Sequence, residues 1–136
     1  MKCKSSPAIR VLIAEDDETS AVVVRTILER LGCLADVVAT GAEAIEAFHS
    51  HTYDLVLMDW EMPVMNGIEA TVRIRTMPRG DTTPIIGTTA GRDRAECLAG
   101  GMNDVMPKPF VFEKLRPVLA RWTGWTSPQE PNASHA

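Results

Sequence analysis

The sequence is poor in cysteine, in long apolar runs and in excess positive charge. Three cysteines, none in a CxxC pair, exclude a zinc ribbon and argue against a disulfide framework, so we expect a reducing, cytoplasmic setting. No apolar run approaches the ~20 residues that span a bilayer, and no signal-peptide pattern opens the chain, so we expect no membrane partner. The 14 basic residues are outnumbered by 18 acidic ones, which argues against a broad basic face that binds nucleic acid.

Short apolar runs alternate with helical patterns along the chain. The 136 residues, 45% hydrophobic and 24% charged, are typical of one globular domain. Strands are predicted at residues 9–14, 34–38, 54–58, 84–88 and 104–106, and a helical pattern follows each of them. This order predicts an α/β fold, in which helices cover both faces of a parallel five-stranded sheet.

Glycine, threonine and proline mark the predicted helix ends. Gly32 stands where a left-handed cap residue ends the first helix, and Thr40 with Glu43 fits a capping box at the start of the second. Pro117 predicts a kinked last helix, or a late start with Pro117 in its first turn. The predicted inward faces consist of Val23, Val24, Ile27, Leu28 and Leu31 in the first helix and Ala44, Ile45 and Phe48 in the second.

Acidic, hydroxyl and basic side chains follow the ends of four predicted strands. They are Glu15 and Asp16 after the first strand, Asp59 after the third, Thr89 after the fourth and Lys108 after the fifth. Ligands of parallel sheets bind at this edge, and in a sheet of order 2-1-3-4-5 the first and third strands are neighbours, so their carboxylates converge. Two carboxylates about 4 Å apart repel by roughly 4 kcal/mol at an effective dielectric near 20, so a cation, a lysine or raised pKa values must offset this repulsion.

The residue types at this edge suit phosphoryl chemistry. Carboxylate oxygens with open positions favour Mg²⁺, and Lys108 adds a second positive charge. With Thr89 as a hydroxyl donor, Asp59 is equipped to accept a phosphoryl group as the nucleophile. We assign Asp17, which lies directly before the first helix, to helix capping and not to this site.

The chain resembles the receiver domain of two-component response regulators. Four segments carry the likeness in the family's order: VLIAEDDE, YDLVLMDWEMPVMNG, PIIGTTA and GMNDVMPKPF. The last of these and the terminal VLARW are most similar to receivers of hybrid histidine kinases. The likeness covers residues 9–122, which leaves an N-terminal extension at 1–8 and a polar tail at 123–136 that we expect to be disordered. It implies a doubly wound (βα)5, flavodoxin-like domain.

The resemblance also implies roles for individual residues. It makes Asp59 the phospho-accepting residue, Thr89 the switch hydroxyl and Lys108 the site lysine, with a cis peptide bond before Pro109. It also implies that Asp16 binds Mg²⁺ directly, that Glu15 acts on the ion mainly through water, and that Glu61 binds the ion through its backbone carbonyl. The implied partner is a sensor histidine kinase or a histidine phosphotransfer protein, and the oligomeric state stays open. Such a domain catalyses its own phosphorylation and slow dephosphorylation but is mainly a signalling protein.

Two departures from the family concern switching. Val105 stands where the family often has an aromatic residue, three positions before Lys108, and residues 90–97 form a segment about three residues shorter than is usual. The alternative function is therefore a non-switching docking module or a phosphate sink.

Other phosphate and metal sites fit the sequence poorly. Glu61 and Pro63 break the motif of a haloacid-dehalogenase-like phosphatase, and Ala21 and Ile27 break an EF-hand loop beginning at Asp16. Neither GxGxxG nor GxxxxGK[ST] occurs, which argues against a nucleotide-binding loop.

Overall fold

Five short parallel strands form the centre of the molecule. The computed structural model describes residues 8–62, 65–89, 91, 94–108 and 112–125. The strands are β1 (Arg10–Ala14), β2 (Leu34–Val38), β3 (Leu55–Asp59), β4 (Ile85–Thr89) and β5 (Asp104–Pro107). They pair in the order β2-β1-β3-β4-β5, so the predicted sheet and its strand order are confirmed.

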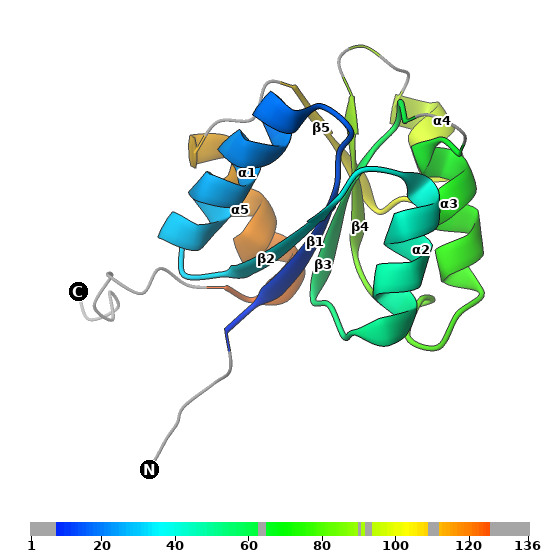
Figure 1. The fold of residues 1–136 in the computed structure, drawn as a ribbon, viewed down its shortest axis with the longest axis horizontal. Helices are drawn as coiled ribbons and strands as arrows, with labels where there is room; N and C mark the ends of the chain where they lie inside the picture. Colours follow the sequence, from blue (N-terminus) through cyan, green and yellow to red (C-terminus); the bar gives the residue numbers. More distant parts are fainter. Residues whose placement is uncertain (1–7, 63–64, 90, 92–93, 109–111, 126–136) are drawn as a thin grey trace.

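Helices cover both faces of this sheet. They are α1 (Glu18–Arg30), α2 (Gly41–Ser50), α3 (Gly67–Arg75), α4 (Arg94–Ala99) and α5 (Phe112–Thr123). Helices α1 and α5 lie on one face, and α2, α3 and α4 lie on the other (Figure 1). No helix of the described ranges combines the length and the apolar character needed to cross a membrane.

Alternate residues of each central strand enter two separate apolar layers. In β3, Leu55 and Leu57 pack with α1 and α5, whereas Val56 and Met58 pack with α2, α3 and α4. All five residues of this strand are buried, including Asp59 at its end. Because both faces are covered, the strand is nearly continuous in apolar character, as its sequence indicated.

The helix ends follow the predicted signals with one difference. Gly32 adopts a left-handed φ of 86° directly after Leu31, the C-cap residue of α1. The hydroxyl of Thr40 accepts a hydrogen bond from the amide of Glu43 at the start of α2. The Glu43 carboxylate, however, accepts from the amide of Ala39 at 2.8 Å, and not from that of Thr40. In a capping box the Glu43 carboxylate would accept from the amide of the N-cap residue, Thr40. Here it accepts from the amide one residue earlier.

One predicted helix-face residue is wrong, and one of the two alternatives for the last helix is excluded. Val23 is 41% exposed, because the buried stripe of α1 consists of Ala21, Val24 and Leu28, spaced three and four residues apart, and position 23 lies beside it. Helix α5 begins at Phe112, so Pro117 lies inside the helix and not in its first turn. Proline has no amide hydrogen there, and the carbonyl four residues earlier loses its helical donor.

The end of α5 lies close to the end of α1. The helix runs to Thr123, one residue past the boundary predicted for the domain. The indole of Trp125 then donates a hydrogen bond to the carbonyl of Leu31 at 2.9 Å. The rest of the predicted tail, residues 126–136, lies outside the described residues.

Candidate functional site

Three carboxylates meet where β1 and β3 end. Glu15, Asp16 and Asp59 each have a ligand oxygen within 4.8 Å of the others. Glu15 and Asp59 are buried, and Asp16 is exposed. The pairing of β1 with β3 brings these residues together, since Ala14 lies opposite Met58 and the acidic residues follow directly.

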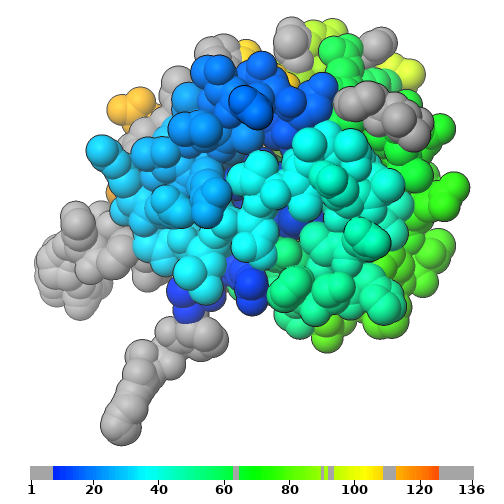
Figure 2. Space-filling view, in the orientation of Figure 1, coloured from blue at the N-terminus to red at the C-terminus, as the bar shows by residue number. Residues whose placement is uncertain are grey.

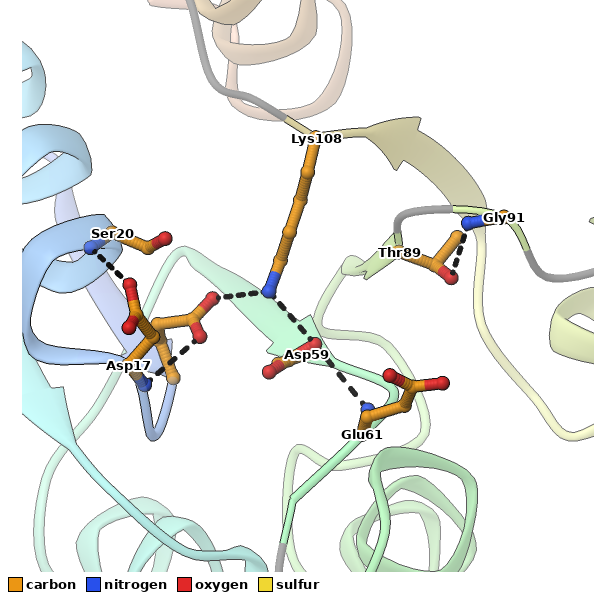
Figure 3. A network of polar contacts seen from close by, with 8 residues as sticks. Asp17, Ser20, Asp59, Glu61, Thr89, Gly91 and Lys108 are labelled. Atoms are coloured by element: carbon orange, nitrogen blue, oxygen red, sulfur yellow. Dashed lines mark hydrogen bonds and ion pairs between the residues drawn. The ribbon is translucent and has the colours of Figure 1, made fainter.

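Lys108 reaches into this carboxylate cluster from the end of β5. Its Nζ lies 2.9 Å from Oε1 of Glu15 and 3.2 Å from Oδ1 of Asp59 (Figure 3). Burial by itself works to lower the pKa of the lysine, but hydrogen bonding to Glu15 and the charge of Asp59 raise it above its ordinary value. The lysine therefore stays charged at neutral pH.

The surroundings of Asp59 favour the protonated form of its carboxyl group. Burial, followed by the negative charge of Glu15, raises the pKa of Asp59 to about 7, although Lys108 acts in the opposite direction. The single positive charge of Lys108 thus does not balance the negative charges of the two buried carboxylates. A divalent cation among the three carboxylates would supply the missing positive charge, so the residues fit a metal of the Mg²⁺ type.

Backbone amides orient the two buried carboxylates. The amide of Glu61 donates to Oδ1 of Asp59 at 3.3 Å, and the amide of Asp17 donates to Oε2 of Glu15 at 3.1 Å (Figure 3). The Asp17 side chain itself accepts from the amide of Ser20 at 2.8 Å, which confirms its predicted capping role. This hydrogen bond lowers the pKa of Asp17.

The start of α3 is shaped by three residues that the sequence analysis missed: Asn66, Gly67 and Glu69. Asn66 and Glu69 form a reciprocal capping box, with bonds of 2.9 and 3.1 Å. A Cβ on Gly67 would lie 2.2 Å from the carbonyl oxygen of Asp59, so only glycine lets the helix begin against the end of β3. The signal was the Asn-Gly pair directly before an apolar helical pattern.

Thr89 lies at the same edge of the sheet, at the end of β4. Its hydroxyl accepts a hydrogen bond from the amide of Gly91 at 3.3 Å (Figure 3). Its backbone carbonyl accepts from the amide of Lys108 at 3.1 Å, which joins β4 to the lysine. The predicted cis bond involves Pro109 and lies outside the described residues.

Comparison with known proteins places this chain in a family. A family model described as the response regulator receiver domain matches residues 11–120. The chain belongs to this family. As a receiver domain, it is 37% identical over 115 residues to the two-component response regulator 24 of Arabidopsis thaliana, and the match covers 82% of the chain and 81% of that protein.

Other relatives of this receiver domain are longer proteins. It is 38% identical over 119 residues to the aerobic respiration control sensor protein ArcB of Escherichia coli K12, which covers 85% of the chain but 15% of ArcB. The chain thus spans a small part of the sensor proteins that it matches.

A solved structure of a related receiver domain has the same fold. It is the receiver domain of the sensor histidine kinase PA1611 from Pseudomonas aeruginosa PAO1, with a TM-score of 0.82 and 36% identity, and the match covers 87% of this chain and 99% of that one. That domain has a magnesium ion coordinated in its active site cleft. The matches favour a receiver of two-component or phosphorelay signalling over a module that only docks.

Proposed function

We propose that Asp59 accepts a phosphoryl group from a phosphohistidine, with Mg²⁺ held by Glu15, Asp16, Asp59 and the backbone carbonyl of Glu61. The observation that carries this proposal is the ammonium group of Lys108 within 3.2 Å of two buried carboxylates at the carboxyl edge of the sheet. When bound, Mg²⁺ would supply positive charge to the carboxylates and to the oxygens of the incoming phosphoryl group.

In this transfer a carboxylate oxygen of Asp59 forms a bond to phosphorus as the bond from phosphorus to the donor imidazole breaks. The product is an acyl phosphate on Asp59 and a histidine that leaves with the bonding electron pair. Lys108 stays protonated and stabilises negative charge on a phosphoryl oxygen. Thr89 is positioned at the strand end to donate its hydroxyl to a second phosphoryl oxygen. Slow attack of water on the acyl phosphate then returns Asp59 to its starting form.

The donor is proposed to be a sensor histidine kinase or a histidine phosphotransfer protein, in the cytoplasm. The relatives that support this include ArcB and the sensor protein GacS of Pseudomonas syringae, which is 36% identical over 126 residues. The buried free thiols of Cys33 and Cys97 suit a reducing compartment.

Helix α1 offers a docking face for this donor beside the carboxylates. Val22 and Val23 are 63% and 41% exposed and lie on the helix that begins directly after Asp16 and Asp17. Figure 2 shows α1 in blue on the open surface of the molecule. Exposed valines on the helix that follows the carboxylate cluster suit a partner that covers the cluster while its histidine enters.

Acetyl phosphate, a small phosphoryl donor, tests the proposed chemistry without a partner. With Mg²⁺ present, intact-protein mass spectrometry should show a single phosphoryl adduct that is lost in Asp59→Asn. An adduct of equal yield in that variant would contradict the assignment. A phosphotransfer profile against candidate histidine kinases would then identify the donor.

A further inference from the structure

The outer edge of β2 turns backbone groups away from the sheet. β2 stands first in the strand order, and in the part of the chain that the structure describes it pairs with β1 alone. The amide of Leu34 donates to the carbonyl of Ile9 at 2.8 Å, and the amide of Glu15 donates to a carbonyl of β2 at 2.9 Å, that of Val38. Leu34 and Val38 thus face β1. Because successive residues of a strand turn their backbone groups to opposite sides, the N–H and C=O of Val37 face outward.

A groove of about 430 Å³ lies beside this edge, between β2 and α2. Val37 and Val38 line it from the strand, and Ala47 lines it from the helix. The helix also contributes two exposed acidic residues, Glu43 and Glu46. Figure 2 shows β2 and α2, in cyan tones, on the face turned toward the viewer. The groove is therefore open to solvent and combines apolar side chains with two carboxylates.

The two carboxylates of the groove have no basic partner. Glu43 is held at the carboxyl end of β2, because its carboxylate accepts from the amide of Ala39 at 2.8 Å. Glu46 lies about one helical turn further along α2. Among the described residues, no lysine, arginine or histidine forms an ion pair with either of them. His51, the C-cap residue of α2, lines the groove beyond them. The negative charge beside the strand edge is thus open to a basic ligand.

We propose that this edge binds an extended basic segment of a partner protein, which adds to the five-stranded sheet next to β2. The backbone of the segment exchanges hydrogen bonds with the N–H and C=O of Val37. Its lysine or arginine side chains, at alternate positions, meet Glu43 and Glu46. Alternate side chains of a strand are about 7 Å apart, which is close to the rise of about 5 Å per helical turn that separates the two carboxylates.

The charges favour this occupant over a second copy of the chain. Two copies that paired through β2 would bring Glu43 and Glu46 of one next to those of the other, and like charges across an interface repel. None of the groove residues belongs to the carboxylate cluster of Glu15, Asp16 and Asp59. The inference therefore goes beyond the proposed phosphoryl transfer and does not depend on it.

A synthetic peptide of about eight residues, in which lysine alternates with threonine, tests the proposal on the full chain. Amide exchange followed by NMR reads the edge directly. At saturating peptide the amide of Val37 should exchange at least about tenfold more slowly than in the protein alone. The amide of Val38, which faces β1, should be protected with and without the peptide. A peptide in which glutamate alternates with threonine should leave the exchange of Val37 unchanged.

Two variants separate the contribution of charge from that of the backbone. Glu46→Lys should raise the Kd of the lysine peptide about tenfold at low salt, because it replaces an attraction by a repulsion. Glu96→Lys, on the exposed side of α4, makes the same change in net charge and should alter the Kd less than about twofold. Val37→Pro removes the outward N–H without removing a bond to β1, and should also raise the Kd about tenfold.

Three results would each overturn the inference. The first is an amide of Val37 that exchanges equally fast with and without the lysine peptide. The second is an equal Kd for Glu46→Lys and Glu96→Lys, which would leave the groove without a role in binding. The third is a dimer of the protein alone in which the amide of Val37 is protected, since this would assign the edge to a second copy of the chain.

Discussion

The ammonium group of Lys108 lies between Glu15 and Asp59, 2.9 Å from the first carboxylate and 3.2 Å from the second. In this position it competes with a divalent cation for the same negative charge and also faces the proposed phosphoryl acceptor. The two roles give opposite expectations for its removal. Loss of the lysine should weaken phosphoryl transfer but should not weaken cation binding.

Lys108→Met tests this separation. We expect the rate of phosphorylation by acetyl phosphate to fall about 100-fold, the usual effect of removing one donor to a developing charge. Mg²⁺ affinity should stay equal or rise, because no ammonium group then opposes the metal. The fluorescence of Trp60, which adjoins Asp59 in the chain, reports the binding. Joint loss of Mg²⁺ binding and phosphorylation would show that the lysine maintains the arrangement of the carboxylates.

The raised pKa of Asp59 predicts a pH-dependent stability. The unfolded chain has an ordinary aspartate of pKa near 3.8, whereas burial and Glu15 raise the pKa of the folded one to about 7. The native state therefore binds the extra proton, and this group's favourable contribution is present below pH 3.8 and lost as the pH rises to 7. In metal-free protein, Asp59→Asn should raise the free energy of unfolding at pH 8 by up to about 4 kcal/mol.

This gain should shrink steadily as the pH falls from 7 to 4. Urea unfolding of the two proteins with a chelator present, at pH 4, 6 and 8, measures it. A gain that is the same at all three pH values would mean that Asp59 is ionised throughout this range.

Asp16 is the exposed member of the carboxylate cluster, and its loss should lower the affinity of the protein for Mg²⁺. Because one negative charge near the ion is removed, Asp16→Ala should raise the Kd for Mg²⁺ at least about tenfold. Asp17→Asn is the matched control, since asparagine still caps α1 and Asp17 is not in the cluster. Fluorescence titration of both variants compares them. Similar affinities for Asp16→Ala and the wild-type protein would place the ion elsewhere.

Arg75 joins the two segments that precede β4 and β5, at the opposite edge of the sheet from the carboxylates. Its guanidinium donates five hydrogen bonds of 2.7–2.9 Å to the carbonyls of Gly80, Thr83 and Gly101 and to the side chain of Asn103. A lysine has one compact ammonium group and cannot reach all four acceptors. Arg75→Lys should therefore lower the free energy of unfolding by about 2–4 kcal/mol.

The exposed Arg73 on the same helix is the control for Arg75. Arg73→Lys should change the free energy of unfolding by no more than about 0.5 kcal/mol, as surface substitutions usually do. Urea denaturation measures both variants. Equal stabilities would show that the hydrogen bonds of Arg75 contribute no more than bonds to water.

The strands and their ends followed from local pattern, and the strand order that joins the carboxylates came with the resemblance to receiver domains, whereas the supporting contacts followed from neither. Apolar runs ending in Glu15 or Asp59 identify strand ends, and a parallel sheet brings strand ends to one edge. The contacts of Arg75 and Trp125 join segments 26 and 94 residues apart, and no short-range pattern encodes such pairs. The exposure of Val23 was missed because three successive valines fit more than one helix face.

Val105 and its neighbours predict a small structural response to phosphorylation. Val105 lies opposite Gly87 on β4, and the sulfur of Met102 occupies the space that a Cβ on Gly87 would need. The short helix α4 is also held to β5, by an ion pair of 2.7 Å between Arg94 and Asp104. A β-branched side chain has few rotamers, so Val105 offers no ring that could move into space vacated by the Thr89 hydroxyl. We expect the partner to respond mainly to the changed charge and to the loop after Thr89.

Amide exchange with and without beryllofluoride, a phosphoryl mimic, tests this expectation. In the wild-type protein, protection should change in the backbone beside Asp59 and Thr89 and change little across residues 94–105. Val105→Tyr supplies the missing ring and is the matched comparison: if the side chain limits the response, this variant should show larger changes over the same residues. Large changes in the wild-type protein that extend through residues 94–105 into α5 would contradict the prediction, because they would require a relay that uses neither an aromatic ring nor a long α4.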